Sequence, residues 1–235
     1  MKKVIMFVLT AMVLSSCSDF IDLKPIDFPT EETFYKDVKG LEGAVIGIYD
    51  ELQSSDQYGA KFMTLMEVRG DNVKNDNSGA SGGITYQIEV FTETPANSNL
   101  SGAWLSLYKT IYRCNLVLQN VEEVPMSDEQ RSRIAGQASF IRALCYFNLV
   151  RLWGEVPIIT KTQTVTEARN NKRAPIDEVY GQIISDLAVA KGLPAVWPES
   201  ERGRATSYAA HALLAKVYLY RNCLLYTSDA ADEAR

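Results

Sequence analysis

A cysteine near the start of the chain carries the most specific chemistry in the sequence. Cys17 closes the run Leu14-Ser15-Ser16-Cys17, in which one aliphatic and two small residues precede the thiol. This run has the pattern of a bacterial lipobox, whose cysteine receives a diacylglycerol group. Acyl chains anchor a protein by burying methylene groups in the bilayer, at about 0.8 kcal/mol each. We therefore expect Cys17 to be lipidated.

The segment in front of Cys17 fits the same processing. Lys2 and Lys3 form a basic start, and the apolar run 4–14 is shorter than the roughly 20 residues that span a bilayer. An ordinary secretory signal or a buried strand is the alternative interpretation. Because the basic start, the apolar length and the lipobox agree, the sequence predicts a signal peptide over residues 1–16 and a lipidated tether over residues 17–36.

Other chemistry finds little support in the sequence. A net charge of −5 over 235 residues provides no basic field for nucleic acid. The single histidine, His211, and the scattered cysteines argue against a metal site, and no Ser-His-Asp or Cys-His order suggests nucleophilic catalysis. We expect no cofactor. Cys114 and Cys145 could form a disulfide outside the cytoplasm, although two buried thiols are the simpler interpretation.

Apolar residues at helical spacing predict five helices as the scaffold. The expected ranges are 38–52, 101–121, 127–153, 175–191 and a segment from residue 207 onward. The third helix opens with a capping box, Ser127 with Gln130, and stops at Gly154. Pro175 suits the first turn of the fourth.

The third and fifth of these helices are apolar on more than one face, which is typical of helices packed on two sides. Their lengths fit helix pairs of the tetratricopeptide kind, with a period of about 34 residues, although the repeat consensus is absent. Two long loops interrupt the pairs. In the loop 70–99, Ile84, Tyr86, Ile88 and Val90 alternate with polar neighbours and predict one short strand. The loop 156–174 begins extended.

The last thirteen residues, 223–235, break the preceding helical pattern. They can be back-translated into a transposase adapter used in sequencing libraries, so we expect the natural sequence to stop near Asn222 and the natural protein to be longer. The alternative is a genuine helix end with an acidic tail. The expected folded part is a truncated helical-repeat domain over residues 37–222.

Four stretches of the chain carry a combined signal. They are CSDFIDLKP from Cys17, WLSLYKTIYRCNLVL from Trp104, QASFIRALCYFNLVRLWGEVP from Gln137 and GRATSYAAHALLAKVYLY from Gly203. Together they resemble the SusD/RagB family of outer-membrane nutrient-binding lipoproteins of Bacteroidetes. The resemblance implies a mainly α fold, in which tetratricopeptide-like pairs form a right-handed superhelix with long loops and one or two short strands.

The same resemblance implies a function. Members of the family lie at the cell surface, lipid-anchored in the outer membrane, over a SusC-like TonB-dependent transporter. They capture a nutrient, usually an oligosaccharide, without chemical turnover and deliver it to that transporter. Two other functions stay open: a surface lipoprotein glycosidase, which would need two placed carboxylates, and a structural helical-repeat adaptor without a ligand.

An oligosaccharide site needs exposed aromatic rings for the sugar faces and amide or carboxylate groups for the hydroxyls. In the loop 70–99, Tyr86 and Phe91 could supply the rings. Five neighbouring polar residues could supply the partners: Asp71, Asn72, Asn75, Asp76 and Asn77. The alternative is a solvated loop rich in turn-forming residues. Trp197 is a further candidate, with capping of a helix end as its alternative.

Several side chains inside the helices are expected to be structural. Arg113 and Asn115 should form a buried hydrogen-bond network between helix pairs, with ligand contact as the alternative. Arg142, Arg151 and Arg204 should be partly buried cations with carboxylate or carbonyl partners. The aromatic ones should pack in the core: Trp104, Tyr108, Tyr146, Phe147 and Trp153.

Overall fold

The computed structural model describes residues 34–70, 72–75 and 83–233, with side chains up to residue 222. The fold described below lies within the unit Tyr35–Arg235. The predicted signal peptide and Cys17 lie outside the described residues. Within the described residues, no helix combines the length and apolarity needed to cross a bilayer.

Helices form almost all of the regular structure in this part of the chain. In order they are α3 (Val38–Leu52), α4 (Lys61–Glu67), α5 (Ile84–Glu89), α6 (Ser98–Asn120), α7 (Asp128–Trp153), α8 (Val165–Arg169), α9 (Ile176–Ala190), a short 3-10 helix η3 (Glu199–Glu201) and α10 (Ser207–Glu233). The extended segment after α7 contributes one isolated antiparallel bridge, between Val156 and Ala174.

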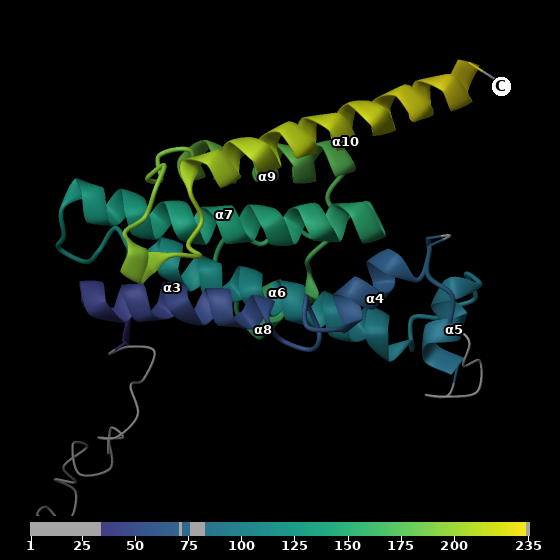
Figure 1. Ribbon diagram of the computed structural model, residues 1–235, viewed down its shortest axis with the longest axis horizontal. Helices are drawn as coiled ribbons and strands as arrows, with labels where there is room; N and C mark the ends of the chain where they lie inside the picture. Colours follow the sequence, from purple (N-terminus) through teal and green to yellow (C-terminus); the bar gives the residue numbers. More distant parts are fainter. Residues whose placement is uncertain (1–33, 71, 76–82, 234–235) are drawn as a thin grey trace, which may run out of the picture. The chain divides into compact units, whose positions relative to one another are not determined.

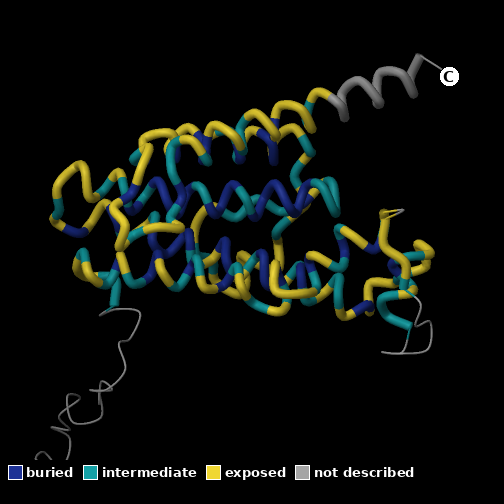
Figure 2. Tube along the Cα trace, in the orientation of Figure 1, coloured by how far each residue is buried: buried dark blue, intermediate teal, exposed yellow. Residues whose placement is uncertain are grey.

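The long helices stack in chain order. Helix α3 packs on α6, α6 on α7, α7 on α9 and α9 on α10, while the short α4 and α5 pack against α6 (Figure 1). The buried residues concentrate along α7, which lies in the middle of this stack (Figure 2). The predicted mainly α fold of packed helix pairs is therefore confirmed.

Helix α7 is the central element, and its ends are set by local sequence. The Ser127 hydroxyl accepts from the Gln130 N–H at 3.2 Å, and the Gln130 side chain accepts from the Ser127 N–H at 3.2 Å. This is the predicted capping box. At the other end Gly154 adopts φ 67°, a left-handed conformation that glycine reaches without strain. As predicted, α7 is packed on two sides.

A buried polar network joins α6, α7 and α9 to the extended segment after α7. The Arg142 guanidinium donates to both oxygens of Asp186, at 2.9 and 2.6 Å, and to Asn115 Oδ1 at 2.8 Å. The Asn115 amide donates in turn to the Ile159 carbonyl at 2.9 Å. Tyr146 donates to the same carbonyl and accepts from the Ile159 N–H. The structural role expected for Asn115 and Arg142 is confirmed.

Helix α10 differs from α7 because only one of its sides is covered. Ala210 and Val217 are buried against the stack. On the opposite side a row of residues spaced by three and four is exposed: Tyr208, Ala212, Ala215 and Leu219. The outer side of α10 is exposed along its described side chains (Figure 2). The fifth helix was predicted to pack on two sides, and in this structure it packs on one.

The predicted strand at Ile84–Val90 is wrong, because this segment forms helix α5. Ile84 and Ile88 are four residues apart, a spacing that suits one face of a helix as well as alternate positions of a strand. No neighbouring strand is present in the described residues to pair with it. The Asn97 side chain instead donates to the Ile84 carbonyl and to Gln87, which fixes α5 against the start of α6.

Most other predictions for the scaffold hold. The first helix has the predicted bounds, and the fourth begins at Ile176, one residue after Pro175. Helices α4 and α8 were not predicted, because seven and five residues are too few to show a period. Cys114 and Cys145 are free, buried thiols, and burial raises the pKa of both.

The buried ion pair between Arg142 and Asp186 leads to a prediction about stability. Asp186→Ala leaves the Arg142 guanidinium buried without its carboxylate, so the free energy of unfolding should fall by about 3–5 kcal/mol. Urea unfolding followed by circular dichroism measures the change. The double variant Arg142→Met, Asp186→Leu should lose less than Asp186→Ala, since it leaves no uncompensated charge.

The control for that experiment is an ion pair at the surface. Glu199 and Arg202 lie 2.8 Å apart and are both about three-quarters exposed, so Glu199→Ala should change stability by at most about 0.5 kcal/mol. An equal loss in Asp186→Ala and Glu199→Ala would contradict the central role of the buried pair.

The backbone conformation of Phe91 leads to a second prediction about stability. Phe91 is the non-glycine residue with positive φ, 55°, in the described chain. A side chain in this conformation costs roughly 1–2 kcal/mol, which glycine avoids. Phe91→Gly should therefore be more stable than Phe91→Ala by about 1 kcal/mol in the same unfolding assay. An alanine variant as stable as the glycine variant would show that the backbone here is unstrained.

Candidate functional site

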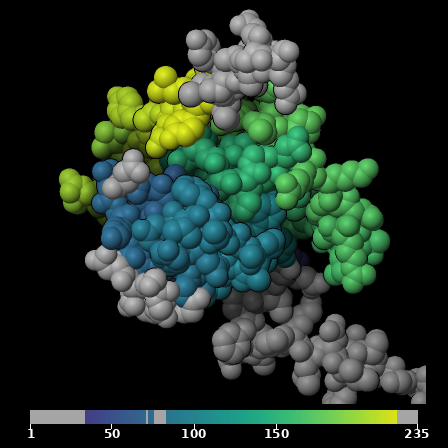
Figure 3. All heavy atoms as spheres, turned by 90° about the vertical axis from the view of Figure 1, so that its right-hand side faces the viewer, coloured from purple at the N-terminus to yellow at the C-terminus, as the bar shows by residue number. Residues whose placement is uncertain are grey.

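An open hollow lies at the end of the stack where α6 begins and α7 ends. Its volume is about 460 Å³, within the range of roughly 300–1,000 Å³ typical of small-molecule sites. We refer to it as the aromatic hollow, and its lining residues are Glu93, Thr94, Pro95, Leu100, Ser101, Trp104, Trp153 and Arg173. Figure 3 views the molecule from this end.

Two tryptophans from different helices form the apolar part of the hollow. Trp104 lies near the start of α6 and Trp153 is the last residue of α7. Their ring centroids are 5.2 Å apart and their planes meet at 82°, an edge-to-face contact. Both are half-buried and line the hollow, and Trp153 also packs on the core cluster around Phe62 and Leu65.

Tyr108 supports Trp104 from one helical turn further along α6. The two ring centroids are 4.9 Å apart, and the Tyr108 hydroxyl donates to the Pro157 carbonyl at 2.8 Å. Burial raises the pKa of Tyr108 well above its usual value, while the nearby charge of Arg173 acts in the opposite direction. The hydroxyl is therefore a neutral donor that holds the segment after α7 beside the hollow.

The loop between α5 and α6 supplies the rim. Glu93 forms an ion pair with Arg69, whose guanidinium carbon also lies 5.9 Å from the centroid of the Phe91 ring. The Phe91 ring is 68% exposed. Asn97 positions this loop, because its side chain caps α6 through the Asn99 N–H and also donates to α5.

The segment after α7 supplies Arg173. The Ala174 N–H donates to the Val156 carbonyl at 3.0 Å, and this bridge fixes the residue next to Arg173 on the end of α7. Arg173 is exposed, and among the described residues no carboxylate forms an ion pair with it. It is the one cation of the hollow without such a partner in the described residues.

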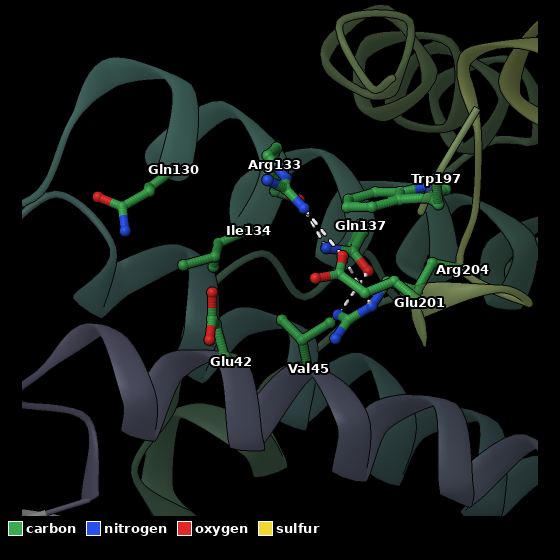
Figure 4. Close-up of a pocket in the computed structure, with 9 residues that line it drawn as sticks. All are labelled: Glu42, Val45, Gln130, Arg133, Ile134, Gln137, Trp197, Glu201 and Arg204. Carbon is green, nitrogen blue, oxygen red and sulfur yellow. Dashed lines mark hydrogen bonds and ion pairs between the residues drawn. The ribbon is translucent and has the colours of Figure 1, made fainter. Parts of the chain in front are cut away.

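A second, smaller pocket lies between α3, α7 and the segment around η3 (Figure 4). Its volume is about 100 Å³, below the usual range for a ligand site. Glu201 accepts from Arg133 at 2.8 Å, and Arg204 donates to Gln137 at 3.2 Å. Both guanidinium groups lie over the Trp197 ring, at 4.6 and 5.7 Å from its centroid.

Several polar groups of this pocket, around Gln137, Glu201 and Arg204, are tied to one another. Trp197 is buried and donates to the Ala205 carbonyl at 2.7 Å. The Tyr49 hydroxyl links the same region to α3, donating to Gln137 and accepting from the Ala205 N–H. The pocket is a structural junction, and Trp197 together with Arg204 has a structural role there.

The predicted ligand residues have different positions. Tyr86, on α5, is 40% exposed, and Phe91 is exposed beside Arg69, without lining the hollow. Asn72 is exposed, while Asn75 is half-buried and its N–H donates to Glu89 at 3.2 Å. Neither asparagine lines the hollow. Asp71, Asp76 and Asn77 lie outside the described residues.

None of the eight residues that line the hollow was predicted as a ligand-binding residue. We expected Trp104 and Trp153 to pack in the core. Both are half-buried and also line the hollow. Trp153 is the last residue of α7 and Trp104 lies within two turns of the start of α6, so their closeness to helix ends was a usable signal. Arg173 gave no signal, since its place depends on the bridge between residues 156 and 174.

Comparison with known proteins agrees with this architecture. A SusD-like family described as starch-binding and associating with the outer membrane matches residues 19–219. A SusD-like protein, P25, of Formosa agariphila is 30% identical over 225 residues, which cover 93% of this chain and 43% of the relative. A second, P2, from the same organism is 31% identical and covers 100% of this chain and 46% of the relative.

Solved structures give the same result. A laminarin-binding SusD-like protein is 31% identical with a TM-score of 0.72, covering 80% of this chain and 41% of that one. Surface glycan-binding protein A from Bacteroides uniformis is 25% identical with a TM-score of 0.69, covering 82% and 44%. The chain spans less than half the length of these relatives. The match over residues 19–219 shows that the chain belongs to the SusD-like family.

Proposed function

We propose that this chain is the lipid-anchored, nutrient-binding component of an outer-membrane uptake system, and that its ligand is an oligosaccharide. The observation that carries the proposal is the aromatic hollow, where Trp104 and Trp153 meet edge to face beside polar groups. The names of a laminarin-binding and a glycan-binding relative support the class of ligand.

The hollow suits a sugar chain in both shape and chemistry. Indole rings and Pro95 offer apolar surface for the C–H faces of a sugar ring, while Ser101, Thr94 and Glu93 offer hydrogen-bonding groups for its hydroxyls. The hollow is open on one side, so further sugar units can extend past it.

Binding without hydrolysis is the proposed activity. Glycoside hydrolysis commonly uses two carboxyl groups, about 5–9.5 Å apart. Among the described residues that line the hollow, Glu93 is the single carboxylate, and it is paired with Arg69. This composition favours a receptor over the glycosidase that the sequence left open.

The anchor and the partner complete the proposal. Lipidation of Cys17 would hold the receptor at the outer membrane, and a SusC-like TonB-dependent transporter would accept the ligand. The tether, residues 17–36, joins the anchor to the helical stack. We infer both from the lipobox and from membership of the SusD-like family.

Ligand binding should depend on the tryptophans. Trp104→Leu keeps apolar volume under the hollow but removes the indole ring, so affinity for a bound oligosaccharide should fall about tenfold or more. Calorimetric titration with laminarin, starch and cellulose oligosaccharides measures it. The neighbouring variant Leu105→Ala is the control, because Leu105 is 67% exposed on α6 and does not line the hollow. Equal affinity in Trp104→Leu and the unmodified chain would place the ligand elsewhere.

Anchoring and partnership can be tested in cells. Cys17→Ala should abolish labelling by a fatty-acid probe and release the protein from the membrane fraction. The unmodified protein should copurify with a TonB-dependent transporter in mild detergent. Copurification without affinity for any sugar would support the structural adaptor instead.

A further inference from the structure

The charges that line the aromatic hollow do not balance. Glu93 is paired with Arg69, so the charges of these two residues compensate each other. Arg173 lines the same hollow and has no carboxylate partner among the described residues. The hollow therefore holds one uncompensated positive charge, next to two indole rings.

The segment that carries Arg173 is basic as a whole. Residues 161–173 contain Lys161, Arg169, Lys172 and Arg173 against one carboxylate, Glu167. That carboxylate is already engaged at the start of α8, where it accepts from the Thr164 N–H and hydroxyl at 2.8 and 2.9 Å. The segment that leads to Arg173 thus carries an excess of positive charge, in a chain whose net charge is −5.

The position of Arg173 is defined by the fold. The bridge between Val156 and Ala174 holds the adjacent residue to the end of α7, close to Trp153. The Tyr108 hydroxyl donates to the Pro157 carbonyl. It lies near enough to Arg173 for the arginine charge to lower its pKa, although burial raises that pKa more. An arginine next to a bridged residue can present its donors to a ligand without ordering a whole loop first.

We propose that the hollow selects an anionic oligosaccharide, in which a uronate carboxylate or a sulfate ester pairs with Arg173 while the sugar ring packs on Trp104 and Trp153. This inference rests on the proposed oligosaccharide-binding function and adds the charge of the ligand. Guanidinium groups bind carboxylates and sulfate-like oxyanions through two parallel hydrogen bonds, which a neutral hydroxyl does not replace.

The test compares ligands that share one backbone and differ in charge. Laminarin oligosaccharides are titrated into the full chain in three forms: neutral, oxidised to the carboxylate at C6, and sulfated. We expect at least one anionic form to bind about tenfold tighter than the neutral form, the size of one charge-assisted hydrogen bond. This preference should shrink as salt is raised, because the pair is partly exposed.

Variants assign the preference to its residue. Arg173→Gln should remove the preference and leave affinity for the neutral form within about twofold, while Arg173→Lys should retain part of it. Lys172→Gln is the matched control, since it removes the same charge from the adjacent exposed residue, which does not line the hollow. A preference reduced equally by both glutamine variants would overturn the specific role of Arg173.

The two anionic arms identify the source of the charge. Tighter binding of the oxidised form alone indicates a uronate, and of the sulfated form alone a sulfate ester. Equal binding of all three forms, weakened by Trp104→Leu, would overturn this inference and leave the proposed function intact. No binding of any form would count against both.

Discussion

The ion pair between Arg142 and Asp186 is the interaction on which the rest of the structure depends. It lies at the meeting point of α6, α7, α9 and the extended segment after α7, through Asn115 and the Ile159 carbonyl. Burial of two charges is costly unless geometry and further hydrogen bonds compensate it. Here every arm of the guanidinium has an acceptor, so the network specifies how the three helices align and where the segment leaves α7.

The aromatic hollow inherits its geometry from that alignment. Trp153 ends the helix that carries Arg142, and Tyr108 binds the segment that the network has fixed. The structural junction around Trp197 also combines an indole with arginines, but there their polar groups are satisfied within the protein. There an indole is covered by two guanidinium groups and its N–H is satisfied. At the hollow the indoles keep one side uncovered, and one arginine keeps its charge uncompensated.

Patterns local in sequence predicted the scaffold well, because capping and helical period act over a few residues. The capping box at Ser127, the glycine stop at Gly154 and the first helix are examples. The strand prediction for α5 failed because four-residue spacing fits a helix and a strand alike. The Asn97 side chain bonds the helix that forms to the start of α6. The hollow required knowledge of distant contacts, such as Val156 with Ala174, which no local pattern contains. Tyr86 and Phe91 were proposed from residue type alone, and neither lines the hollow.

The one-sided packing of α10 has a consequence for how this chain unfolds. In stacked helical arrays each layer is stabilised chiefly by its neighbours, so local stability follows the number of covered sides. Helix α7 has neighbours on both sides, whereas the outer row from Tyr208 to Leu219 is exposed. Amide protons should accordingly exchange with solvent fastest along α10 and slowest along α7. Local stability should therefore decrease from α7 to α10. The hollow lies at the end of α7, the most protected helix.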